Sequence, residues 1–102
     1  MQISITGRHI NLTDNVKAHV EEKLARCLSA FPHIDTVHVI LDAEKHENVA
    51  EIVIQAPHRV HVVAKEHSEN LYDAIDRAAE HAERQLHKHY DKLHDHHKAA
   101  KG

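Results

Sequence analysis

The chain has no tryptophan and one phenylalanine, so any core must be built mainly from aliphatic side chains. A single cysteine excludes an intramolecular disulfide and fits a reducing compartment. With only two glycines, the chain cannot build a glycine-rich phosphate loop or a dinucleotide-binding fingerprint. No apolar run approaches the roughly 18 residues of a membrane-spanning helix, and the N-terminus lacks a signal-peptide pattern. These absences predict a soluble, cytoplasmic protein of one domain, because 102 residues are too few for two.

The charge of the chain is unevenly distributed along its length. The net charge is −3 with neutral histidines, which by itself argues against a nucleic-acid binder. From Arg84 to Gly102, however, five Lys or Arg side chains stand against two Asp, whereas the other 83 residues hold eight basic and fourteen acidic ones. Such asymmetry predicts a basic C-terminal end that contacts a polyanion.

Two kinds of hydrophobic periodicity predict the fold. Apolar and polar residues alternate over 1–5, 36–43, 49–56 and 59–64, which is typical of half-buried strands. Residues 6–8, around Gly7, are expected to form a turn or bulge. Helical spacing runs over 14–29, after a Thr13 cap and before Pro32. It returns over 70–93, where Ser68 or Asn70 is expected to be the cap.

The resulting order is βαβββα, which predicts an α+β domain over residues 1–95. A four-stranded sheet would carry both helices on its single apolar face. Residues 96–102 have no apolar periodicity and are expected to form a disordered tail rich in His and Lys.

The second helix sorts its side chains into three faces, one of them apolar. A basic stripe is formed by Arg77, His81, Arg84, Lys88 and Lys92, and an acidic face by Asp73, Asp76, Glu80, Glu83 and Asp91. The stripe extends for roughly 20 Å at 1.5 Å per residue, long enough to follow several phosphates of a nucleic acid. The alternative is an ordinary surface helix with i,i+4 pairs such as Glu80–Arg84 and Glu83–His87.

No sequence motif indicates catalysis, so we expect no enzyme, no small-molecule substrate and no cofactor. Cys27 lies on the apolar stripe of the first helix and is expected to be a core residue. Fourteen histidines are unusual, but no two of them stand four residues apart on the second helix, so no metal site is predicted. Since histidine has a reference pKa near 6.5, we expect affinity for a polyanion to rise as the pH falls from about 7 to 6.

Several segments resemble the bacterial ribosome hibernation factors, a family that includes the hibernation promoting factor and the ribosome-associated inhibitor. They are M-Q-I-S-I-T-G-R at the N-terminus, E-K-L-A-R in the first helix, and E-N-L-Y-D-A-I-D and E-R-Q-L-H-K-H-Y-D-K-L in the second. The resemblance covers residues 1 to about 95, in the order of the family.

The resemblance implies a fold like a double-stranded-RNA-binding domain and a role in ribosome hibernation. Family members bind the small ribosomal subunit and its rRNA near the decoding centre, where they block mRNA and tRNA and inhibit translation in stationary phase. Short members promote inactive ribosome dimers, and this chain resembles a short member that is monomeric when free. Partners would be the small subunit and the whole ribosome, with no membrane.

The resemblance also implies which residues bind rRNA: Lys23 and Arg26 on the first helix, and Arg84, Lys88 and Lys92 on the second. Arg77 and His81 lie on the same stripe, although His81 stands where the family often has Lys. Two alternatives remain open, a generic structured-RNA-binding module and a His-rich metal-binding protein.

Overall fold

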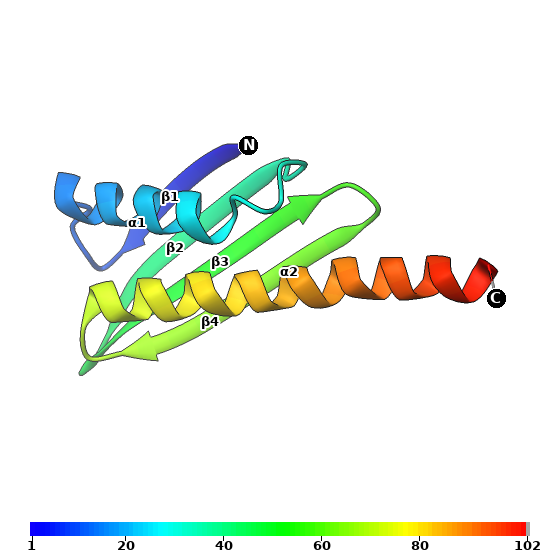
Figure 1. The fold of residues 1–102 in the computed structure, drawn as a ribbon. Coiled ribbons are helices and arrows are strands. Elements are labelled where there is room, and N and C mark those ends of the chain that lie inside the picture. Colours follow the sequence, from blue (N-terminus) through cyan, green and yellow to red (C-terminus); the bar gives the residue numbers. More distant parts are fainter. Residues whose placement is uncertain (102) are drawn as a thin grey trace.

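The computed structural model describes the backbone of residues 1–101 and the side chains of residues 1–91. Its elements confirm the predicted βαβββα order (Figure 1): β1 (Gln2–Arg8), α1 (Asp14–Cys27), β2 (Thr36–Glu44), β3 (Glu47–Ala56), β4 (Val60–Ser68) and α2 (Leu71–Lys101). The strands form one sheet in the order β1-β2-β3-β4. Strand β1 is parallel to β2, and the other two pairings are antiparallel. Within the described residues, no helix is long and apolar enough to cross a membrane.

Both helices cover the same face of the sheet, as predicted (Figure 1). The inward residues of the strands alternate with outward ones and meet the apolar faces of the helices in one core. Leu24, Ile52 and Leu86 are each at most 1% exposed, and burying such a side chain contributes about 1.5–3 kcal/mol. Among the described side chains no polar or charged residue is buried, so this core is aliphatic apart from Cys27 and Phe31.

Side-chain caps fix where each helix begins. The Thr13 hydroxyl accepts a hydrogen bond from the Val16 N–H at 3.2 Å. At the start of α2, Asn70 Oδ1 accepts from the N–H groups of Tyr72 and Asp73 at 2.9 and 3.3 Å. These bonds satisfy N–H groups that have no partner inside the helix. They confirm the predicted Thr13 and Asn70 caps.

The prediction of a turn at residues 6–8 is wrong. Gly7 lies within β1, paired with Leu41, and its φ is not positive. A Cβ at this position would lie 2.9 Å from the Ile10 carbonyl oxygen and 2.9 Å from Leu12 Cγ. Gly7 is therefore needed because the chain beyond β1 passes close over it, and not because the backbone turns there.

The backbone turns instead at residues that have side chains. Non-glycine residues with positive φ are His9 (57°), Lys45 (44°), His58 (65°) and Arg59 (61°), all in connections between elements. Each costs roughly 1–2 kcal/mol relative to the right-handed conformation. With only two glycines, the chain accepts this strain at its turns.

Helix α2 is longer than its apolar pattern predicts. It runs to Lys101, past the expected end at Leu93, and projects beyond the sheet (Figure 1). The domain boundary at residue 95 and the disordered tail over 96–102 stay predictions, because the side chains from Lys92 onward and the whole of Gly102 lie outside the described residues.

Candidate nucleic-acid interface

The packing of α2 decides where its polar faces point. The apolar face of α2 packs on β3 and β4. It includes Ile75, Ala78, Ala82 and Leu86, whose side chains are each at most 1% exposed. With this face fixed on the sheet, one polar flank of α2 turns toward α1 and the other toward the outer edge of β4. The acidic and basic residues therefore meet different surroundings.

The acidic face of α2 lies against α1. His19 Nε2 is 2.7 Å from Asp76 Oδ1, and Lys23 Nζ is 2.9 Å from Glu80 Oε2. In each helix the two partners are four residues apart, so the pairs form successive rungs between the helices. Two residues of the acidic face, Asp76 and Glu80, thus form interhelical contacts.

These contacts change two pKa values. The hydrogen bond to Glu80 raises the pKa of the Lys23 ammonium, which is held in its charged form. Burial raises the pKa of the Cys27 thiol, with a smaller contribution from the charge of Glu83. Cys27 is 7% exposed and protonated, which fits its predicted place in the core.

Two cations of the basic stripe face solvent without an acidic partner among the side chains that the structure describes. Arg84 and Lys88 are exposed, and among residues 1–91 no carboxylate lies within ion-pair distance of either. The expected Glu80–Arg84 pair is absent from this part of the chain because Glu80 bonds Lys23 instead. Arg84 and Lys88 are one helical turn apart and can contact neighbouring phosphates.

Two predicted arginines are exposed but paired within their own helices. Arg77 Nε lies 2.8 Å from Asp73, and Arg26 Nη2 lies 2.8 Å from Glu22, both at i,i+4 spacing. Exposed pairs of this kind are worth only about 0.2–1 kcal/mol, so either arginine can exchange its partner for a phosphate. Two further predicted residues differ: Lys23 is bound to Glu80, and the Lys92 side chain lies outside the described residues.

His81 points toward the sheet and not into the stripe. Its Nδ1 is buried 2.8 Å from the Glu66 carboxylate of β4, in an ion-pair contact without a well-directed hydrogen bond. Its Nε2 lies 3.0 Å from Gln85 Nε2, which donates to the Val63 carbonyl at 2.9 Å. Gln85 therefore covers a backbone acceptor on the edge strand.

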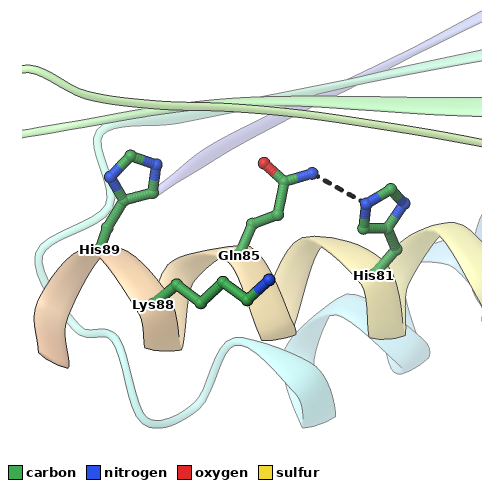
Figure 2. A pocket seen from close by; sticks show the side chains of 4 residues that line it. All are labelled: His81, Gln85, Lys88 and His89. Carbon is green, nitrogen blue, oxygen red and sulfur yellow. Dashed lines mark hydrogen bonds between the residues drawn. The ribbon is translucent and has the colours of Figure 1, made fainter. Parts of the chain in front are cut away.

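Sequence reasoning missed a shallow groove of about 390 Å³ beside the stripe. It is lined by His81, Gln85, Lys88 and His89, which project from successive turns of α2 (Figure 2). The i,i+4 spacing of His81, Gln85 and His89 was the available signal, since it places three hydrogen-bonding side chains in one row. No group of three potential metal ligands converges within the part of the chain that the structure describes.

Comparison with known proteins gives consistent matches over nearly the whole chain. The family model described as Sigma 54 modulation protein / S30EA ribosomal protein matches residues 3–94. The ribosome hibernation promoting factor of Pseudomonas putida is 41% identical over 92 residues, which cover 90% of this chain and 89% of the relative. The protein of the same name from Escherichia coli K12 is 32% identical over 97 residues, covering 94% and 100%.

Solved structures show the same fold. A ribosomal subunit interface protein from Coxiella burnetii superposes with a TM-score of 0.84 at 23% identity, over 89% of this chain and 99% of that one. The N-terminal domain of Thermus thermophilus Protein Y gives a TM-score of 0.76 at 33% identity, over 84% and 96%.

Proposed function

The chain belongs to the Sigma 54 modulation protein / S30EA ribosomal protein family, which includes the ribosome hibernation promoting factors, and we propose that it binds the small ribosomal subunit near the decoding centre. There it would occupy the path of mRNA and tRNA, inhibit translation and promote inactive ribosome dimers in stationary phase. It would act in the cytoplasm as a free monomer that joins the small subunit or the whole ribosome.

The observation that carries this proposal is the separation of charge on α2. Asp76 and Glu80 face α1, whereas Arg84 and Lys88 face solvent with no carboxylate of residues 1–91 nearby. A phosphate backbone approaching this side can therefore contact Arg84 and Lys88, which no carboxylate of residues 1–91 pairs with. Contacts with phosphates position a protein on folded RNA without reading its bases, as recognition of rRNA by shape requires.

The proposed inhibition is steric. A rigid domain bound in the path of mRNA and tRNA excludes them by volume, and its affinity comes from phosphate contacts along α2. Arg77 and Arg26 would add contacts once they leave their pairs with Asp73 and Glu22. Lys92 lies four residues beyond Lys88 and would extend the row. No bond-making step is needed.

Sedimentation with purified ribosomes tests the proposal. The wild type should travel with small subunits and whole ribosomes in a sucrose gradient, and Arg84→Glu/Lys88→Glu should stay at the top. The matched control is Lys17→Glu/Lys45→Glu, which makes the same change in net charge at exposed positions on α1 and at the β2–β3 turn. It should sediment like the wild type.

Two further readouts sharpen the test. Loss of two phosphate contacts should reduce the slope of log affinity against log salt concentration by about 1.4–1.8. Addition of mRNA and tRNA should displace the bound protein from small subunits. A generic RNA-binding module would remain bound under the same conditions. A wild type that remains at the top of the gradient, or a control that fails as completely as the stripe variant, would disprove the proposal.

A further inference from the structure

A second hollow, of about 390 Å³, opens between α2 and the segment that joins α1 to β2. Its wall carries four ring side chains, Phe31, His33, His87 and Tyr90. This volume lies within the range of about 300–1,000 Å³ found for pockets that hold small organic groups. Few other places in a chain with three Phe, Tyr and Trp residues could gather so many rings.

Packing of the core requires only part of this wall. Phe31 is 8% exposed, with Tyr90 stacked on it at 5.4 Å and 20° between ring planes. The rings of His87 and Phe31 form a T-shaped contact with 4.9 Å between their centroids, yet the His87 side chain is 54% exposed. His33 is exposed as well. Two imidazoles thus present ring surface to the hollow while contributing little buried area.

The charges around the hollow indicate which part of a nucleotide enters it. Asp91 lines the hollow and would repel a phosphate, but its carboxylate can accept hydrogen bonds from N–H groups. Lys88 stands three residues before Asp91, and Arg84 three before His87, so on the helix surface each cation neighbours a residue that lines the hollow. A base in the hollow would therefore have its phosphates beside the basic stripe.

We infer that the hollow receives an unpaired guanine of the small-subunit rRNA, with its backbone on Arg84 and Lys88. The inference rests on the proposed function, which brings the RNA to this surface. Unstacked bases of folded RNA are recognised by stacking on Phe, Tyr and His rings and by hydrogen bonds to their exposed edges. Guanine fits because adjacent ring and exocyclic N–H groups can donate to both oxygens of Asp91.

The test compares two double variants on purified small subunits. His33→Ala/His87→Ala removes the exposed rings, and His46→Ala/His61→Ala removes two exposed imidazoles from the β2–β3 turn and from β4. Loss of stacking should weaken binding about 5- to 140-fold in the first variant, and the second should bind like the wild type. Kethoxal modifies unpaired guanines. One rRNA guanine should be protected from kethoxal when the wild type or the control is bound, and it should be modified when the ring variant is bound.

Asp91→Ala separates this inference from simple electrostatics. Removing a negative charge beside Lys88 should tighten binding if only phosphate contacts matter, whereas the inference requires weaker binding and renewed guanine reactivity. A wild type that does not sediment would overturn the proposed function and the inference together. A sedimenting wild type with an equally tight ring variant would overturn the inference alone. Weaker binding without any change in guanine reactivity would also overturn it, in favour of a protein side chain in the hollow.

Discussion

The ion pair between Lys23 and Glu80 gives a sharp test of how α2 divides its charges. Lys23 was predicted to bind rRNA, yet its ammonium lies 2.9 Å from Glu80 and its side chain is only 20% exposed. We expect Lys23→Met to lower the free energy of unfolding and to leave ribosome affinity almost unchanged. Met keeps the apolar stem of the side chain, so the substitution removes mainly the charge.

The structure sets the size of this effect. Glu80 is 51% exposed, so solvent screens the pair, and exposed pairs contribute about 0.2–1 kcal/mol. The burial of Lys23 places this pair near the upper end, at about 1 kcal/mol. Because Glu80 raises the pKa of Lys23 in the folded state, this contribution is complete at neutral pH. It should disappear only as the pH rises through the folded-state pKa, beyond about 10.4.

A double-mutant cycle with Glu80→Gln measures the coupling by urea unfolding at pH 7. The two single variants should each be less stable than the wild type, and the double variant should lose little more than one of them. In parallel, the salt dependence of ribosome binding by Lys23→Met should match that of the wild type. A coupling energy near zero, or a slope reduced by the 0.7–0.9 of one phosphate contact, would refute the reasoning.

Two backbone predictions follow from the glycine and turn positions. Gly7→Ala should lower the free energy of unfolding by about 1–3 kcal/mol because its Cβ would meet the Ile10 carbonyl, whereas at an uncrowded position without a positive φ the same change would stabilise by about 0.4–1 kcal/mol. Arg59→Gly should raise stability by up to about 1 kcal/mol, or roughly 4–8 °C in Tm, by relieving a φ of 61°. Urea midpoints at constant m-value and thermal melts measure the stability of both variants. A more stable Gly7→Ala or a less stable Arg59→Gly would contradict the corresponding prediction.

Element order and helix caps could be predicted because their signals are local. Alternation through Val37, Val39 and Leu41 identifies a strand with one buried face, and the structure buries all three to at most 1% exposed. Thr13 and Asn70 precede helical patterns and can bond only the N–H groups just after them. Such features depend on neighbours within a few residues, so tertiary contacts did not override them.

The errors came from contacts that hydrophobic periodicity does not reveal, one between near neighbours and one between distant parts of the chain. Nothing near Gly7 in sequence shows that Leu12 passes over it, so a turn was the natural interpretation of a lone glycine. The partner of Glu80 could equally have been Arg84 on the same helix. The helical period does not reveal that Lys23, 57 residues earlier, lies closer. Periodicity finds the faces of a helix, but packing decides what each face meets.

This distinction explains how an acidic protein can present a basic surface. Acidic side chains outnumber Lys and Arg by sixteen to thirteen, which argued against an RNA partner. On α2, however, Asp76 and Glu80 contact His19 and Lys23 of α1, and neither carboxylate pairs with Arg84 or Lys88. The order of charges along the helix, more than their sum, therefore determines what the surface can bind. A helix of the same composition in scrambled order would lose the interhelical pairs and the adjacent, exposed Arg84 and Lys88 together.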